Sequence, residues 1–150
     1  MKLTLLLADA AEAVNGKLYI LGGGWSITGP DPTPSAIAIK IEVPWDQANT
    51  RHQLKLELFN DDGQPIMVPG PTGEQPVVLS GEFEVGRPAG LKPGTPLDLA
   101  LAFHIAPLLL PPAGRYVWRC SVDGRSDEDW QVPFSTRPAR KTQPGTARDR

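Results

Sequence analysis

Apolar and polar residues alternate along most of this chain. In residues 36–43 an isoleucine or valine occupies every second position, at Ile37, Ile39, Ile41 and Val43. Because successive side chains of a β-strand point to opposite faces, this period of two predicts a strand with one buried face. Further strands are predicted in residues 3–10, 17–21, 53–58, 77–85, 97–105, 115–123 and 130–135. No window longer than about ten residues favours a helical period.

Turn residues separate the predicted strands. Asn15-Gly16, between residues 3–10 and 17–21, is a pair typical of a two-residue hairpin loop. Asp123-Gly124 and several proline–glycine pairs punctuate the later strands in the same way. A single helical turn, capped by Asp46, is expected in residues 46–49.

One-sided alternation is typical of antiparallel sheets whose apolar faces pack on each other. A parallel α/β sheet would instead show unbroken apolar runs separated by helices. The predicted fold class is therefore all-β: an antiparallel β-sandwich of the immunoglobulin-like kind, with a small β-barrel as the alternative.

Composition agrees with one turn-rich domain. The chain has 150 residues, of which 40% are hydrophobic, so it can build one core. Its 15 Gly and 17 Pro exclude a helical bundle and a coiled coil. No apolar run approaches the roughly 20 residues of a membrane-spanning helix. We expect a single domain over residues 1–136.

The last residues form a different kind of segment. Residues 137–150 contain no aliphatic residue larger than Ala and carry a net charge of +4, which leaves −6 on the preceding residues. Such a segment buries too little surface to offset its ordering entropy, so a disordered basic tail is predicted. The acidic body argues against a nucleic-acid-binding face on the folded domain. The tail either contacts an acidic partner or is a solvated end without a role.

The triple glycine at residues 22–24 could suggest a phosphate-binding loop. Such a loop precedes a helix and continues into Gly-Lys-Ser/Thr, whereas here Trp25-Ser26-Ile27-Thr28 keeps β character. We expect a sharp bend where a strand changes sheet, with a positive φ at Gly23.

Residues that could support catalysis or bind a metal are few. His52 and His104 are the only histidines. Alternation places Cys120, the single cysteine, in the core beside Trp118, and places His104 on a solvent-facing side. These positions predict neither a Cys–His nucleophile nor a zinc site. Acidic clusters at residues 61–62 and 127–129 are expected in turns, where paired carboxylates could hydrolyse a glycoside. We predict no catalytic, cofactor-binding or metal-binding residue.

Apolar residues at strand ends and in loops are the candidates for contact with a partner. Trp25 and Trp45 could cap the core, anchor a partner, or form a stacking platform for a sugar. Leu108, Leu109 and Leu110 are bracketed by prolines and could either cross an open edge of the core or form an exposed apolar patch. Arg137, Arg140 and Lys141 of the basic tail complete the predicted contact residues.

The opening and closing hairpins resemble a known group of sequences. Leu3–Ala10 with 16–23, and later 112–118 with Val122-Asp123-Gly124, are similar to a small family of uncharacterised bacterial domains, found notably in actinobacteria and associated with phages. The resemblance covers about residues 1–136 and consists of strand and turn residues. It implies a β-sandwich with no assigned activity.

Taken together, these features predict a non-enzymatic binding or assembly module that acts through loops and sheet edges. Its partner would be another protein or a second copy, with no membrane, no cofactor and no nucleic acid on the folded domain. The expected location is the cytoplasm, or a phage particle assembled there. The alternative is a β-sandwich that recognises or hydrolyses carbohydrate through loop carboxylates and the strand-end tryptophans.

Overall fold

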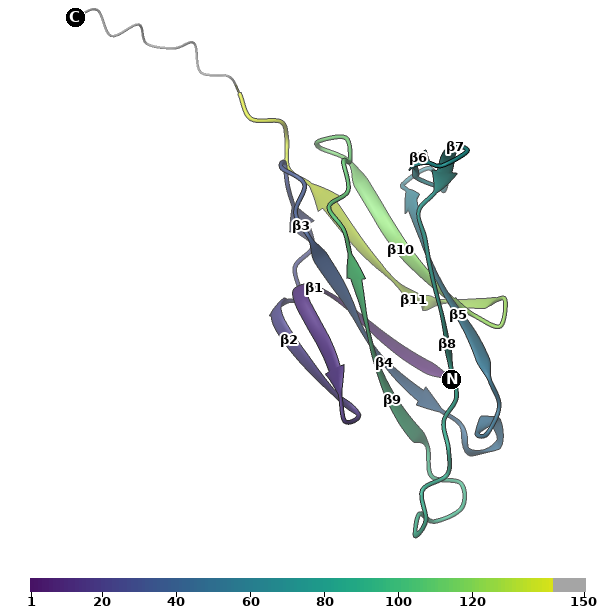
Figure 1. The fold of residues 1–150 in the computed structure, drawn as a ribbon. Coiled ribbons are helices and arrows are strands. Elements are labelled where there is room, and N and C mark those ends of the chain that lie inside the picture. The colour runs from purple at the N-terminus through teal and green to yellow at the C-terminus, as the bar shows by residue number, and fades with distance from the viewer. Residues whose placement is uncertain (142–150) are drawn as a thin grey trace, which may run out of the picture.

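The computed structural model describes residues 1–141, which contain eleven strands and one short 3-10 helix (Figure 1). Residues 142–150 of the predicted basic tail lie outside the described residues. The strands form two large sheets and one small ribbon. No helix in residues 1–141 is long and apolar enough to cross a membrane.

The first sheet contains four strands and the second contains five. The first has the order β2 (Lys17–Gly23), β1 (Lys2–Val14), β4 (Ser35–Val43) and β9 (Leu97–Ile105). The second has the order β3 (Ile27–Thr28), β11 (Arg125–Thr136), β10 (Arg115–Val122), β5 (His52–Asn60) and β8 (Val78–Phe83). Neighbouring strands are antiparallel except β3 and β11, which run parallel.

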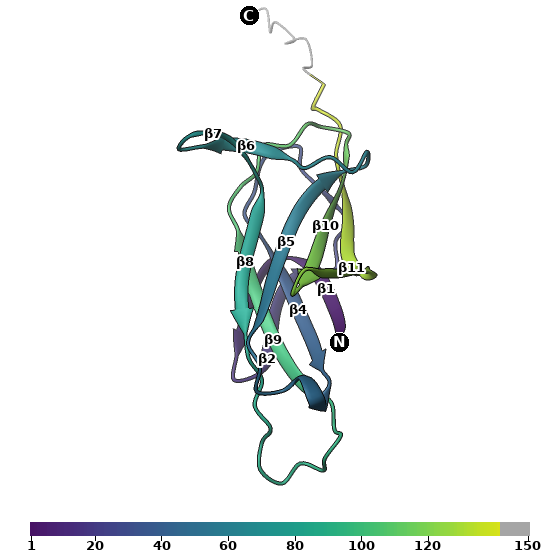
Figure 2. The ribbon, with the colours of Figure 1, turned by 90° about the vertical axis from the view of Figure 1, so that its right-hand side faces the viewer.

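The two sheets pack face to face around one core (Figure 2). Leu7 and Ile39 come from the first sheet, whereas Leu56 and Trp118 come from the second, and all four side chains are almost completely buried. These residues occupy the alternating positions that the sequence pattern selects, because one face of each strand must be dry. The prediction of an all-β fold is confirmed.

The strand order resembles that of immunoglobulin domains for six of the seven principal strands. Strands β1, β4 and β9 share one sheet, and β5, β10 and β11 share the other. The remaining strand, β8, pairs with β5 instead of β9, so it belongs to the second sheet. In constant-type immunoglobulin domains the corresponding fourth strand lies in the first sheet.

Both predicted two-residue turns are present. Asn15 and Gly16 have φ values of 51° and 73° and connect β1 to β2, and Asp123 and Gly124, at 52° and 78°, connect β10 to β11. Two successive positive φ values define the hairpin turn that matches the twist of the strands it joins. Asn, Asp and Gly are the residues that tolerate this conformation best.

The triple glycine is the bend at which the chain changes sheet, as predicted. Strand β2 ends in the first sheet at Gly23, and β3 joins the second sheet at Ile27. The prediction of a positive φ at Gly23 was wrong, because Gly22 and Gly24 carry the positive values, 61° and 88°. Gly23 is required for space instead: a Cβ there would lie 2.5 Å from Ile20 Cγ2.

The β1–β2 hairpin covers a surface that the pattern predicted to face solvent. The first half of β1 pairs with β4, and the second half pairs with β2 alone. Ala11 and Leu18 of the hairpin pack against Ala36 and Ala38 on the outer face of the first sheet, and both of these alanines are buried. Small side chains allow this close approach, so part of the first sheet is buried on both faces.

Two local predictions need correction. The short helix spans Trp45–Gln47 instead of residues 46–49, and its N-terminal cap is Pro44, without a side-chain hydrogen bond from Asp46. Residues 67–76, predicted only as a loop, form the ribbon of β6 (Met67–Gly70) and β7 (Gly73–Pro76), which projects from one end of the molecule (Figure 2).

Candidate functional site

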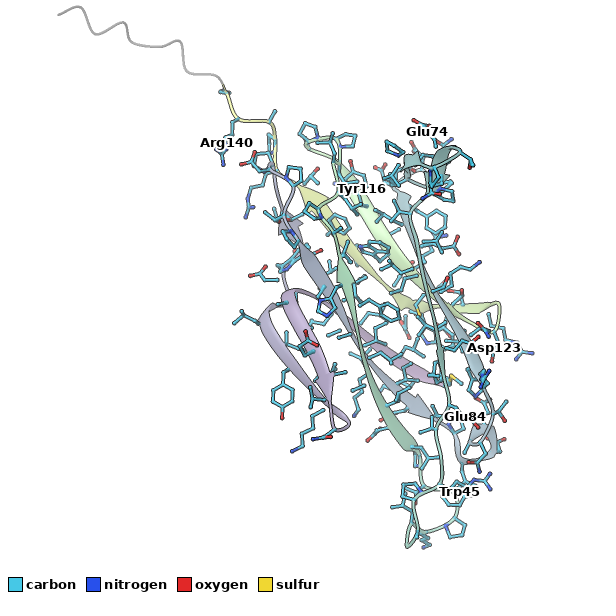
Figure 3. The ribbon with its side chains drawn as sticks, viewed as in Figure 1. Trp45, Glu74, Glu84, Tyr116, Asp123 and Arg140 are labelled. Atoms are coloured by element: carbon cyan, nitrogen blue, oxygen red, sulfur yellow. The ribbon has the colours of Figure 1, made fainter. Side chains whose placement is uncertain are left out.

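Most of the predicted contact residues lie at one end of the sandwich. Trp25 follows β2, Leu108–Leu110 lie between β9 and β10, and Arg137 and Arg140 follow β11. The segment of residues 28–35 lines one cleft together with Trp25, Leu108 and Leu110, and it bonds to Arg137 and Arg140. Trp45 lies at the opposite end, far from Arg140 and Tyr116 (Figure 3). The structure therefore brings together residues that are distant in sequence and leaves Trp45 apart.

Trp25 is held edge-on against Phe134. The two ring centroids are 6.1 Å apart and the rings are nearly perpendicular, which is a favourable aromatic geometry. The indole Nε1 is buried, and no acceptor in residues 1–141 receives its hydrogen bond. A buried donor without an acceptor costs free energy, so Trp25 carries an unsatisfied polar group at this end of the sandwich.

A narrow cleft adjoins Trp25, and we call it the end cleft. Its volume is about 50 Å³, enough for a few water molecules or one small side chain but far below the roughly 300 Å³ of typical small-molecule sites. Threonine, serine and aspartate side chains line it alongside apolar ones. The lining residues are Trp25, Thr28, Gly29, Pro30, Asp31, Pro32, Thr33, Ser35, Ile105, Ala106, Leu108, Leu110, Trp118, Phe134 and Thr136.

The loop between β9 and β10 is fixed at its end by hydrogen bonds to one carbonyl. The Tyr116 hydroxyl donates to Pro111 O at 2.9 Å, and the Thr136 hydroxyl donates to the same oxygen at 2.8 Å. Tyr116 also stacks on Phe134. This contact is similar in geometry to the tyrosine corner of immunoglobulin-like sandwiches, and we call it the tyrosine corner. The sequence pattern did not reveal this contact.

The sequence left open whether the three leucines of this loop cover an edge of the core or form an exposed apolar patch, and the structure shows both. Leu108 and Leu110 pack against the core at the end of the sandwich, whereas Leu109 between them is 84% exposed. The outer two leucines therefore cover the edge of the core, and their burial presents Leu109 to solvent. An exposed leucine on a fixed loop is a suitable anchor for another protein.

The basic segment is tied to the same end of the domain. Arg137 N–H donates to Thr28 O at 2.9 Å, and its guanidinium donates to Gly29 O at 2.8 Å. Arg140 lies 2.9 Å from an Asp31 carboxylate oxygen. Regular hydrogen bonding thus extends one residue beyond the predicted domain boundary at Thr136. Lys141 is exposed.

One face of the Trp45 ring is covered by the side chain of Arg87. The Arg87 guanidinium lies 4.7 Å from the centroid of the Trp45 ring and donates two hydrogen bonds to Trp45 O, at 2.6 and 3.1 Å. The cation–π contact covers one face of the ring. Trp45 and Trp25 lie at opposite ends, so they do not form a joint stacking platform.

His52 is buried at the start of β5. Its Nδ1 lies 2.7 Å from Asp123 Oδ2 and its Nε2 lies 2.9 Å from Gln47 O. Both ring nitrogens face acceptor oxygens, so the imidazolium, which donates from both, satisfies the site best. Burial lowers the pKa of His52, but the Asp123 carboxylate and the Gln47 carbonyl outweigh it, and the net pKa is raised.

The same contacts act on Asp123 in the opposite direction. Hydrogen bonds from His52 and from Gln53 N–H lower the pKa of the Asp123 carboxyl group. A signal for this cluster was present in the sequence, because His52 occupies the same alternating positions as the buried Leu54, Leu56 and Leu58. The turn at Asp123 was predicted, but its hydrogen bond across the sheet was not.

Cys120 lies in the core, as predicted. It is completely buried, and this burial raises the pKa of its thiol to about 12. A thiolate is therefore unfavourable at neutral pH. His104 is exposed and lies 3.4 Å from Glu12, on the outer side of the first sheet. No group of three or more His, Cys, Asp or Glu residues in residues 1–141 is arranged to hold a metal ion.

The two acidic clusters lie toward opposite ends of β10. Residues 61–62 follow Asn60, which pairs with Tyr116 near the start of that strand, whereas Ser126, beside residues 127–129, pairs with Ser121 near its end. Residues 127–129 lie in β11 instead of the predicted turn. The structure does not bring the two clusters together across one cleft, as paired glycosidase carboxylates require.

Comparison with known proteins places the chain in a family. No curated protein and no solved structure gives a significant match. One family model matches residues 3–135, from the first strand to the penultimate residue of β11. The match includes Tyr116, the His52–Asp123 pair and every lining residue of the end cleft except Thr136. The chain therefore belongs to DUF6941, a family of unknown function.

Proposed function

We propose that this protein is a non-catalytic binding or assembly module whose partner protein contacts the end cleft and Leu109. The observation that carries the proposal is Leu109, which is 84% exposed between two leucines that pack against the core. Its side chain would provide apolar contact to a bound segment, beside the end cleft that Trp25 lines.

The size and rigidity of the end cleft favour a protein partner. A cleft of about 50 Å³ accommodates one side chain of a docked segment, and larger ligands exceed it. Its loop is held by Tyr116 and Thr136, so little conformational entropy is lost on binding. Arg137 bonds to Gly29 O and Arg140 pairs with Asp31, so the two arginines position residues 29–31 beside the contact surface.

The resemblance described above suggests the biological setting. We place the protein in the cytoplasm of an actinobacterial cell, or in a phage particle assembled there, without contact to a membrane or to nucleic acid through the folded domain. The partner is then either a cellular protein or a neighbouring protein of the particle. Carbohydrate recognition receives less support, because Arg87 covers a face of Trp45 and the tryptophans lie apart.

A crosslinking experiment tests the proposal. A photo-crosslinking amino acid at position 109, in cells of the source organism, should yield a defined adduct, whereas the same residue at position 91 should not. Leu91 is the matched control, because it is an exposed leucine in the loop between β8 and β9 at the opposite end. Equal labelling from both positions would contradict the proposed surface.

The identified partner then allows a quantitative test with purified proteins. Leu109→Glu should weaken binding at least about tenfold, the scale of a removed anchor residue. Leu91→Glu should leave the affinity unchanged. Unchanged affinity in Leu109→Glu would refute the proposal.

A further inference from the structure

The β1–β2 hairpin presents an uncovered sheet edge (Figure 1). Within residues 1–141, β2 pairs with β1 alone, and six of its seven residues are exposed. On the other side of the molecule the Phe103 side chain of β9 lies over β8, since a Cβ on Gly81 would come within 3.2 Å of its ring. Among residues 1–141, the β2 edge has no comparable cover.

The direction of the backbone groups of β2 follows from its turn. Val14 and Lys17 close a two-residue hairpin, so they form a hydrogen-bonded pair, and such pairs alternate along the ladder. Lys17 and Tyr19 therefore direct their N–H and C=O groups toward β1. Leu18 and Ile20 direct theirs outward, where a further strand can bond to them.

The devices that usually protect an edge strand are sparse in β2. Natural edges carry charged residues or prolines that prevent another strand from pairing. Strand β2 has no proline, and its one charged residue is Lys17 at its start. Tyr19 and Leu21 lie on the outward face of the hairpin and are 58% and 71% exposed. This edge can therefore accept another strand.

The charges at the two ends of the edge favour an identical strand in antiparallel orientation. Lys17 lies at one end, and the Asp9 carboxylate lies over Gly22 at the other, since a Cβ on Gly22 would overlap it. Antiparallel pairing of two copies brings Lys17 of each toward Asp9 of the other. Parallel pairing would place like charges together, which is unfavourable.

We infer that two copies of this protein associate by antiparallel pairing of their β2 strands about a two-fold axis at Tyr19. Leu18 of each copy exchanges backbone hydrogen bonds with Ile20 of the other, and the two Tyr19 side chains face each other. The four-stranded sheets join into one continuous sheet. This interface shares no residue with the end cleft, so each proposal can fail independently.

Sedimentation equilibrium tests the association and its charge pattern. The wild-type chain should form a dimer whose population rises with concentration. Lys17→Asp and Asp9→Lys should each weaken the dimer at least about tenfold, because like charges then meet across the interface. The double variant exchanges the two charges and should restore wild-type affinity. Lys92→Asp, in the loop between β8 and β9, is the control and should have no effect.

A disulfide test checks the register. Facing residues of a non-hydrogen-bonded antiparallel pair have Cα atoms about 4.5 Å apart, within the range that a disulfide bridges. Tyr19→Cys should therefore crosslink two copies under mild oxidation, whereas Glu12→Cys, one strand further in, should not. Circular dichroism verifies that each variant is folded. A wild-type monomer at all concentrations, or a dimer that neither the charge variants nor Tyr19→Cys affects, would overturn the proposal.

Discussion

The His52–Asp123 pair makes the stability of the fold depend on pH in a specific direction. The pKa of His52 is raised in the folded protein, so its stabilisation is complete below the unfolded value of about 6.5 and is lost as the pH rises through the folded pKa. The pKa of Asp123 is lowered, so its stabilisation is present above about pH 3.9 and is lost as the pH falls through the folded value. Maximum stability is expected between about pH 4 and 6.5.

Asp123→Asn is the informative substitution. Asparagine tolerates the positive φ of the turn, so the hairpin is retained while the charge is removed. At pH 5.5 the hydrogen bond from the buried imidazolium loses its charged acceptor, which should cost about 1.5–3 kcal/mol. For a chain of this size the loss corresponds to a decrease in Tm of about 3–12 °C. Above the folded pKa of His52, where the imidazole is neutral, the difference should shrink to about 1 kcal/mol or less.

Urea denaturation of both proteins between pH 5.5 and 8.5, followed by circular dichroism, measures this effect. NMR titration of the imidazole signals gives the pKa of His52 directly, and a His104→Gln variant assigns the two histidines. The pKa of His52 should decrease in Asp123→Asn. If the free energy of unfolding of the two proteins changes in parallel with pH, or if wild-type stability increases from pH 5.5 to 8.5, the reasoning is refuted.

Three further outcomes follow from other contacts. Tyr116→Phe removes the hydrogen bond to Pro111 O and should lower the free energy of unfolding by about 1–2 kcal/mol in urea titrations; no change would exclude a stabilising corner. Cys120 should react with a thiol reagent slowly in the native protein and rapidly in urea, and rapid native labelling would contradict its burial. A chain that ends at Thr136 should be about 1–3 kcal/mol less stable than one that ends at Lys141, because it loses two backbone hydrogen bonds of Arg137; equal melting temperatures would contradict this.

Strand positions could be predicted from the sequence because alternation is a local property. Ile37, Ile39 and Ile41 are buried as a period of two requires, and Asn15-Gly16 forms the expected turn. Alternation does not state which strands are neighbours. The burial of Ala36 and Ala38 therefore could not be predicted, since it depends on a hairpin that folds over them from another part of the chain.

The individual residues of the candidate site could be predicted from the sequence, but their gathering at one end of the sandwich could not. Trp25, Leu109 and Arg137 were selected for their chemistry and their positions at strand ends. Their gathering at one end depends on the sheet order and on the parallel pairing of β3 with β11, neither of which has a local signal. The burial of His52 was not predicted, although its position in the alternating pattern matches that of Leu54.

The β1–β2 hairpin also separates the folding of the chain into an early and a late event. Its two-residue turn joins neighbouring segments and can close within microseconds. Its docking surface, however, includes Ala102 of β9, so it exists only after the distant strands β4 and β9 have paired. The hairpin should thus dock last and detach first, exchanging its amide protons through local openings while the sandwich stays closed.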